Sequence, residues 1–308
     1  YYYKKTNDIL VQTPYIAAMG EGGEPWVNGA SMNNQGVEFT VSFKSDPSSE
    51  FQWAVSANIG TYKTELTDLP SNVINKYAGD GVHDLILGRS PNSAYGLVAD
   101  GIFKTQEEVD AHADQPGKAV GRIRYKDLDG DGVINETYDR TWIGCYDPDF
   151  FGGLNFDFAY KGFDLNLFFE GMFGNDVNSD WKKESDIWLF TNPAWKNHAT
   201  RMLGGWSPDN PNSDIPAISN NTANQEQRFS SWFIEDGSYI KLRNIELGYT
   251  FNFEGLKKAG ISNLRLYTNG TNLITIDGVK DADPEQRDAS LGGYPLRKII
   301  NFGVQATF

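Results

Sequence analysis

The sequence predicts an all-β protein, and within that class a segment of an antiparallel transmembrane β-barrel with long external loops. Apolar and polar residues alternate strictly in several separate stretches, and the connections between them alternate between short and very long. The composition agrees, because 14% of the 308 residues are aromatic and 32 are glycine, while only 39% are hydrophobic. Such a chain has many large rings but few long apolar runs, which favours half-apolar strands over a helical core.

Period-two alternation marks the predicted strands. Side chains of a strand point alternately to its two faces, so each stretch forms a ribbon with one apolar and one polar side. The clearest stretches are residues 36–43, 51–59, 154–160, 163–169, 244–253 and 300–308, and weaker ones are Tyr2–Val11 and Leu264–Ile276. We therefore expect about eight strands.

The connections between these strands differ greatly in length. Short turns are expected near Ser45–Glu50, at Lys161-Gly162 and around Gly255–Asn263, whereas residues 63–149, 174–231 and 277–296 are expected to be long structureless loops. A transmembrane barrel has short turns at one end and long loops at the other. A compact soluble domain rarely carries loops of that length. A soluble β-sandwich, whose strands also alternate, is the alternative architecture.

The two faces of the predicted strands differ in a way that favours a membrane. The apolar faces are rich in Phe, Tyr and Trp near strand ends, as in the aromatic girdles of barrels. The polar faces are mostly Asn, Ser, Thr, Gln and Gly rather than charged residues, which suits a lumen that holds water or a plug. We expect outer-membrane lipid to contact the apolar faces.

Charge and cysteine content exclude several classes of protein. The net charge of −14 argues against nucleic-acid binding, which needs a basic face. The single cysteine, Cys145, rules out an intrachain disulfide framework and a cysteine-rich metal cluster. No stretch approaches the 18 consecutive apolar residues of a transmembrane helix. The three histidines are far apart and lack metal-ligand spacing, so we expect no enzyme and assign no catalytic residue.

Residues 127–135, DLDGDGVIN, form an acidic loop of the kind that binds calcium. The candidate ligands are the carboxylates of Asp127, Asp129 and Asp131 and the carbonyl of Val133, with Gly132 at the sharp turn and Ile134 as an apolar anchor. Position 12 of the loop is Tyr138 rather than the usual glutamate, so Asp139, or alternatively Glu136, would supply the last carboxylate. Flanking helices are not expected, so the site would be a structural calcium clip in an external loop, not a sensor. An acidic turn without ordered metal is the alternative.

The predicted loop 174–231 contains four of the eight tryptophans of the chain. Exposed indoles can stack on sugar rings, so these residues are candidate contacts for a substrate or a lid: Trp181, Trp188, Trp195 and Trp206. The alternative is that they pack the loop against itself.

Three long stretches make the sequence resemble a known family. They are residues 127–177, which run from DLDGDGVIN through DRTWIG to DPDFFGGLNFDFAYKGFDLNLFFEGMFGNDV, then WSPDNPNSDIPAIS at 206–219, and FIEDGSYIKLRNIELGYTF at 233–251 with LRLYTNGTNLITI and the final YPLRKIINFGVQATF. Their order and spacing, with GVEFTVSF and FQWAVSANIG nearer the start, resemble the C-terminal barrel region of SusC-like (RagA-like) TonB-dependent outer-membrane transporters of Bacteroidetes.

This resemblance implies a fold, a location and a set of partners. Such transporters resemble a barrel of about 22 strands around a plug, so residues 1–308 would be the C-terminal part, about the last eight strands, without the plug and the N-terminal strands. The family implies import of a large nutrient, an oligosaccharide or peptide, across the bacterial outer membrane. A SusD-like surface lipoprotein would close over the extracellular loops, and TonB would act through the absent N-terminal part. The remaining strands would complete the wall, because unpaired sheet edges are costly in lipid.

Two other functions stay open on the sequence. One is a secreted calcium-dependent all-β carbohydrate-binding module, and the other is a glycoside hydrolase of the β-sandwich type. Both require the apolar strand faces to be buried between two sheets, whereas the barrel requires them to face outward.

Overall fold

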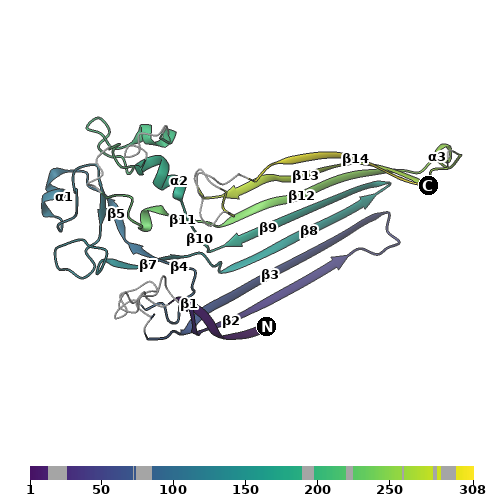
Figure 1. Cartoon of the computed structure of the whole chain (residues 1–308). Helices are drawn as coiled ribbons and strands as arrows, with labels where there is room; N and C mark the ends of the chain where they lie inside the picture. The colour runs from purple at the N-terminus through teal and green to yellow at the C-terminus, as the bar shows by residue number, and fades with distance from the viewer. Residues whose placement is uncertain are drawn as a thin grey trace.

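The computed structural model describes residues 1–12, 26–71, 73, 85–188, 198–219, 225–258, 260–279, 283–285 and 296–308 (Figure 1). Its main element is one antiparallel sheet of eight strands, in which every strand pairs with its neighbour in sequence within the sheet. In spatial order the strands are β1 (Tyr2–Gln12), β2 (Trp26–Lys44), β3 (Phe51–Asp68), β8 (Phe150–Tyr160), β9 (Phe163–Phe173), β12 (Tyr239–Phe251), β13 (Asn263–Asp277) and β14 (Ile299–Thr307). The prediction of about eight alternating strands is confirmed.

The short connections all lie at one end of the sheet and the long ones at the other (Figure 1). The turn between β8 and β9 consists of Lys161 and Gly162, both with positive φ, at 47° and 88°. Two successive residues of this kind define the two-residue hairpin turn whose twist matches that of the strands. The turn between β12 and β13 contains the short helix α3 (Glu254–Lys258). The predicted short–long alternation is therefore present in the structure.

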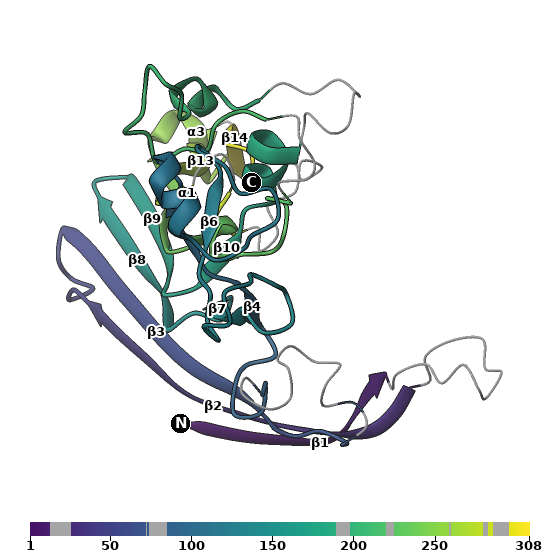
Figure 2. The ribbon, with the colours of Figure 1, turned by 90° about the vertical axis from the view of Figure 1, so that its left-hand side faces the viewer.

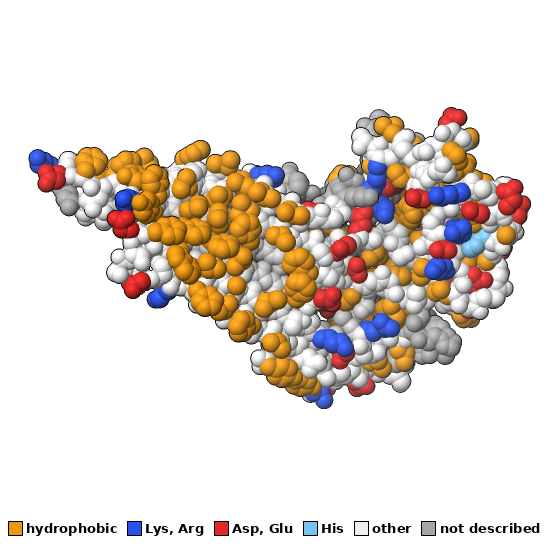
Figure 3. All heavy atoms as spheres, turned by 180° about the vertical axis from the view of Figure 1, so that it is seen from behind, with side chains coloured by type: hydrophobic (Ala, Val, Ile, Leu, Met, Phe, Trp, Pro, Cys, Tyr) orange, Lys and Arg blue, Asp and Glu red, His pale blue; other side chains and the backbone are white. Residues whose placement is uncertain are grey.

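The sheet is strongly curved (Figure 2). Its two faces differ in chemistry. The convex face carries a broad apolar surface (Figure 3). Large side chains exposed there include Phe39, Phe43, Phe163, Leu247, Phe302 and Val304. No second sheet packs on this face among the residues that the structure describes, so a β-sandwich does not account for the described part of the chain.

The long connections between β3 and β8 and between β9 and β12 are folded, which corrects the expectation of structureless loops. They contain short elements: β4 (Ser93–Leu97), β5 (Ala99–Ile102), α1 (Gln106–Ala111), β6 (Ile123–Tyr125), β7 (Arg140–Cys145), β10 (Asp176–Asn178), α2 (Asp180–Lys182), the π-helical turn η3 (Lys183–Trp188), the 3₁₀ turns η4 (Thr200–Gly204) and η6 (Ser231–Phe233), and β11 (Ile234–Asp236). Strand pairs β4–β7, β5–β6 and β10–β11 form three two-stranded sheets. We call the described residues 85–149 and 175–238 the loop body.

The loop body has an apolar core of its own. Leu97, Ile102, Ile123, Tyr125 and Ile134 are buried in one cluster, with Trp206 and Trp232 packed against its edge. A second cluster, which includes Val11, Ala30, Leu66 and Ile86, lies where β1, β2 and β3 reach the loop end of the sheet. The chain thus has its buried core at the loop end, and the strands extend away from it as a single layer (Figure 1). In the described part of the chain, no helix has the length and apolar character needed to cross a bilayer.

Candidate functional site

The concave face of the sheet carries a continuous polar ladder across four strands. Asn166 on β9 donates from Nδ2 to Asn155 Oδ1 at 3.0 Å and to Asp157 Oδ1 at 2.7 Å on β8. Asn269 on β13 donates to Asn244 Oδ1 on β12 at 2.6 Å. These amide groups therefore have hydrogen-bond partners on the neighbouring strands. This agrees with the predicted lumen-facing Asn, Ser and Thr residues.

The concave face also carries ion pairs, which the sequence reasoning did not anticipate. At the end with the short turns, Arg265 of β13 pairs with Asp164 of β9, and its Nη2 lies 2.7 Å from Glu246 Oε1 of β12. At the loop end, Lys241 and Arg243 of β12 face a second group of carboxylates. The expectation of a mostly uncharged inner face is therefore wrong at both ends of the sheet.

The acidic loop 127–135 lies in the loop body between β6 and β7, so strands and not helices flank it, as predicted. Its conformation is fixed by carboxylates that accept backbone N–H groups. Asp127 accepts from Gly130 and Gly132 at 2.7 and 2.9 Å, and Asp129 accepts from Asp131 at 3.1 Å. Ile134 is 2% exposed and belongs to the loop-body core, which confirms it as the apolar anchor.

The structure brings together three of the five predicted calcium ligands. One carboxylate oxygen each of Asp127, Asp129 and Asp139 lies within 4.8 Å of the others. Asp131 is not in this group, and its Oδ1 accepts the Val133 N–H at 2.7 Å. Val133 itself is exposed. Of the two alternatives for the last carboxylate, Asp139 lies beside Asp127 and Asp129, and calcium binding itself stays a prediction.

Asp139 follows the acidic loop in sequence and accepts hydrogen bonds from both ends of it. It is completely buried, and its two oxygens accept the N–H groups of Leu128 at 2.8 Å and Asn135 at 2.7 Å. A buried carboxylate is stable only when hydrogen-bonded or paired with a cation, and these two bonds provide part of that stabilisation. Asp139 therefore links the two ends of the loop and directs its remaining acceptor positions toward Asp127 and Asp129.

The carboxylates of this loop have opposite pKa shifts. Although partial desolvation acts the other way, the hydrogen bonds from Gly132 and Gly130 lower the pKa of Asp127 below its ordinary value. The Asp131 N–H favours the charged form of Asp129, but desolvation and the nearby charges of Asp131 and Asp139 raise the pKa of Asp129. Carboxylates crowded in this way repel one another, and a bound cation relieves the repulsion.

The four tryptophans of loop 174–231 do not form one described surface. Trp195 lies outside the described residues, and so does the side chain of Trp188. Trp181 is half-buried at α2. Trp206 packs on Gly121, where a Cβ atom would lie 2.7 Å from Trp206 Cε3 and where φ is +80°. For Trp206 the structure thus agrees with packing of the loop, and ligand contact by the other three stays a prediction.

A buried ion pair joins distant parts of the loop body. Arg122 Nη1 lies 2.7 Å from Glu226 Oε2, and both side chains are less than 8% exposed. Glu226 also accepts the Ile123 N–H at 2.8 Å. Burial raises the pKa of Glu226 above its ordinary value, although the Arg122 guanidinium and the Ile123 N–H favour its charged form. This pair fixes residues 225–230 against β6, and no pattern in the sequence indicated it.

Sequence comparisons relate the chain to TonB-dependent receptors. No protein-family model matches it. It is 32% identical over 329 residues to TonB-dependent receptor P3, and 29% identical over 325 residues to TonB-dependent receptor P26, both from Formosa agariphila. It is 24% identical over 317 residues to TonB-dependent receptor SusC of Bacteroides thetaiotaomicron. Each alignment covers 100% of the chain but only 32%, 32% and 29% of the relatives, so the chain spans about a third of their length.

Solved structures share the fold. The structure of the RagAB peptide transporter matches with a TM-score of 0.78 at 23% identity, covering 99% of this chain and 32% of that chain. The RagAB peptide importer in the open-open state matches with a TM-score of 0.75 at 22% identity, over 99% of this chain and 32% of that one. Likeness at this level of identity establishes the fold.

Together these findings define the chain first as a section of a transmembrane β-barrel wall with long connections at one end. Along its whole length, it is a homologue of TonB-dependent receptors of the SusC type. The resemblance that the sequence motifs indicated is therefore confirmed.

Proposed function

We propose that this chain forms part of the wall and the external loops of an outer-membrane transporter that imports a large nutrient, an oligosaccharide or a peptide, with energy delivered through TonB. The observation that carries the proposal is the single-layer sheet with an apolar convex face, a polar concave face and all long connections at one end. A convex apolar face suits lipid, and a polar concave face suits an aqueous or plugged lumen. The chain contributes positioned surfaces to transport rather than bond-making groups.

The proposal includes partners that complete the transporter. The outer strands β1 and β14 each have one neighbour in the sheet, and backbone groups at a sheet edge need partners in lipid. Further strands of the same transporter would pair with them, and a plug would fill the polar concave side. A SusD-like surface lipoprotein would bind over the loop body, and TonB would act on a part of the transporter outside these residues. The names of the relatives, TonB-dependent receptors and SusC, support this assignment.

Uptake by whole cells tests the proposal. The gene for the full transporter would be deleted and restored, and cells would be offered fluorescent oligosaccharides and fluorescent peptides too large for porins. We expect cells with the restored gene to take up one of the two cargo classes, and cells without the gene to take up neither. This uptake should stop when the proton gradient is removed. Equal uptake of both cargo classes with and without the gene, or recovery of the protein in the soluble fraction, would contradict the proposal.

We further propose that Asp127, Asp129 and Asp139 hold a calcium ion that fixes the loop between β6 and β7. Calcium binds oxygens at 2.3–2.6 Å, so two ligand oxygens on opposite sides of one ion lie about 5 Å apart. The spacing within 4.8 Å in this group is compatible with that requirement. The ion would order an external loop and take no part in moving cargo.

Terbium, a luminescent substitute for calcium, tests the clip directly. The purified transporter would be titrated with terbium and then with calcium, with exposed Tyr138 as the sensitiser beside the loop. We expect Asp129→Asn to weaken binding at least about tenfold, because it removes one charged ligand. Asp110→Asn, an exposed carboxylate on α1, is the matched control and should leave binding unchanged. Equal affinity in wild type and Asp129→Asn would exclude this site.

A further inference from the structure

A β-bulge on β12 places Arg243 on the concave face beside Lys241, which lies there in the regular register. Leu242 pairs with Phe169 of β9 and Ile274 of β13, whereas Asn244 pairs with Phe168 and Thr271. Against β9, Arg243 is therefore an extra residue in β12. Against β13 the extra residue lies in β13, where Asn272 and Leu273 both stand opposite Arg243. A bulge of this kind re-aims a side chain, and here Arg243 joins Lys241 on the same face.

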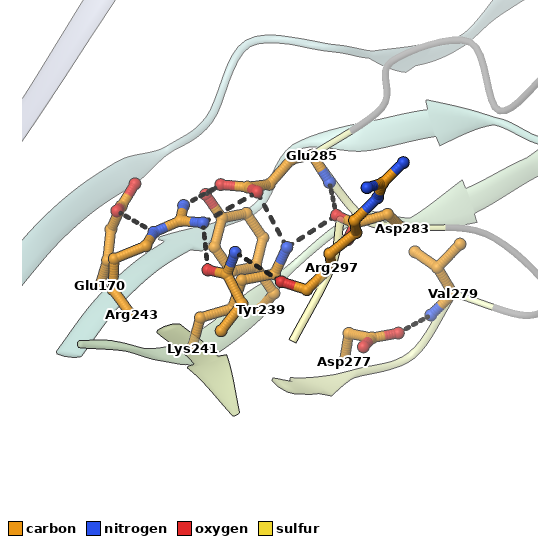
Figure 4. A network of polar contacts seen from close by, with 10 residues as sticks. Glu170, Tyr239, Lys241, Arg243, Asp277, Val279, Asp283, Glu285 and Arg297 are labelled. Atoms are coloured by element: carbon orange, nitrogen blue, oxygen red, sulfur yellow. Dashed lines mark hydrogen bonds and ion pairs between the residues drawn. The ribbon is translucent and has the colours of Figure 1, made fainter. Parts of the chain in front are cut away.

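Strand β13 has its own irregularity opposite this bulge. Asn272 of β13 has a φ of +54°, a backbone conformation that Asn tolerates better than most residues. Its Oδ1 accepts from Arg243 Nη1 at 3.0 Å, and its Nδ2 donates to the Arg297 carbonyl at 3.4 Å. The bulge thus brings β12, β13 and the residues that precede β14 to one point on the inner wall (Figure 4).

Lys241 is a buried cation that needs a partner. Its side chain is 1% exposed, and its Nζ lies 2.7 Å from Asp283 Oδ1 and 2.9 Å from Glu285 Oε2 (Figure 4). An ammonium group buried without a counter-charge is costly, so these carboxylates are required wherever Lys241 stays buried. Both belong to residues 283–285, Asp-Pro-Glu, in the connection between β13 and β14.

Residues 283–285 are held at several other points. Glu285 pairs with Arg243 and accepts from Tyr239 Oη at 3.2 Å. Its own N–H donates to Asp283 Oδ1 at 3.0 Å, which closes the turn. Arg243 has an additional partner on the wall, Glu170 of β9, at 2.8 Å. Arg243 therefore keeps a counter-charge without residues 283–285, whereas the two carboxylates described around Lys241 both come from them.

We propose that Asp283 and Glu285 form an ionic strap that docks the β13–β14 connection onto the inner wall at Lys241 and Arg243, and that this docking closes one side of a cavity at the loop end. The cavity has a volume of about 320 Å³, and its walls include Pro284 and Glu285 of the strap together with Glu170, Asn175, Asp176 and Tyr239. When the strap is released, this cavity opens to the concave side of the sheet. Its effect on cargo passage rests on the proposed import function, but the docking itself does not.

The proposal also specifies the chemistry that competes with the strap. The wall provides two cations, one of them almost inaccessible to solvent, while the strap carboxylates are 13% and 22% exposed. A small carboxylate or other anion can therefore replace the strap while leaving Lys241 neutralised. The Lys241–Arg243 pair is an anion site that the chain occupies with its own carboxylates.

Hydrogen exchange of the full transporter in detergent tests the strap without any transport assay. In Asp283→Asn/Glu285→Gln we expect exchange of the amides of residues 277–279, 283 and 285 to rise at least about tenfold, because the ion pairs that hold the strap are lost. Lys241→Met should also raise exchange at the strap. It should leave the amides of β12 protected, because the buried Lys241 charge is gone and Arg243 still pairs with Glu170. The triple variant Lys241→Met/Asp283→Asn/Glu285→Gln keeps the test valid if the double variant folds poorly, and its strap should also be released.

The chain offers a matched control and a rescue. Asp164→Asn/Glu246→Gln removes two carboxylates from Arg265 at the other end of the same face, and strap exchange should not change. Acetate, used as the probe anion, should stabilise β12 in Asp283→Asn/Glu285→Gln but not in the triple variant. Unchanged exchange at residues 277–279, 283 and 285 in both Lys241→Met and the double variant would overturn the proposal. Acetate acting equally on the double and triple variants would also overturn it. A negative uptake result with a positive exchange result would overturn only the import function.

Discussion

In the sheet, Phe302 exposes 84% of its surface and Trp53 38%, whereas in the loop body Phe103 and Phe233 are completely buried. The same kinds of side chain thus serve two different environments within one chain. The loop body is stabilised by its own core, as in a soluble domain. Among the described residues no such core covers the convex face of the sheet, so in the proposed transporter lipid would cover these apolar side chains. The difference teaches that the stability of the two regions depends on different surroundings.

The largest expected effect comes from truncating a side chain in the loop-body core. Phe103→Ala should destabilise the loop body by about 3–5 kcal/mol, because it removes a buried ring and leaves a cavity. Phe302→Ala, the matched change on the convex face, should leave the loop body unaffected. Hydrogen exchange of amides in β4–β7 would measure both. Similar losses of loop-body protection in the two variants would mean that the regions are not independent.

A smaller effect is expected from the buried ion pair of the loop body. Glu226→Gln should cost about 3 kcal/mol locally, because Arg122 then keeps a buried charge without its carboxylate. Asp214→Asn removes the partner of Lys104 in an exposed pair and should have no measurable effect. Exchange of the Ile123 amide reports the change. If the loss comes from the unpaired Arg122 charge, the double variant Arg122→Met/Glu226→Gln should be less destabilised than Glu226→Gln alone.

The smallest effect concerns the pH dependence of the strap at the loop end of the sheet. Burial acts in the opposite direction, but hydrogen bonds from Arg243 and Lys241 lower the pKa of Glu285 from 4.5 to about 2. Because the folded pKa is below the unfolded value, the stabilisation is fully present above pH 4.5 and is lost as the pH falls toward 2. Asp283 and Glu170 also face these cations.

A nitroxide label on Pro284→Cys, in a chain with Cys145→Ser, would follow this release by its mobility. The spectrum should be constant between pH 7 and 5 and should become more mobile below pH 4.5. In Lys241→Met, mobility should already be high at pH 7. A mobility change centred near pH 7 would show that groups other than these carboxylates control the strap.

The strands were predictable from the sequence because lipid and lumen impose a strict period of two. The predicted strands at residues 36–43 and 51–59 match the regular parts of β2 and β3, but both strands are longer in the structure. Their extensions, such as Asn33-Asn34-Gln35, lie near the loop end and do not alternate, so no periodic signal marked them. The family motifs indicated the rest of the architecture.

The candidate sites were predictable only where one short segment holds them. Asp127, Asp129 and Asp139 lie within 13 consecutive residues. The spacing rule for calcium loops indicated Asp127 and Asp129, and Asp139 was a candidate because it follows the expected last position by one residue. The strap joins residues 42 and 44 positions apart, and the pair Arg122–Glu226 joins residues 104 apart, so no local pattern could reveal either. One signal was available, since apolar residues of β12 step from Ile240 to Leu242 and then to Ile245. A step of three within a period of two indicates a bulge.

The most direct test of the membrane-wall account is a site-directed spin-label scan of β14 in the full transporter, reconstituted in lipid with Cys145 replaced by Ser. Labels at positions 302 and 304 should be accessible to oxygen dissolved in lipid, and labels at 301 and 303 to a water-soluble nickel complex. This alternation is expected because Phe302 and Val304 lie on the apolar convex face while Asn301 and Gly303 face the polar side. Equal accessibility of all four positions to the nickel complex would contradict the account, because the convex face would then contact water instead of lipid.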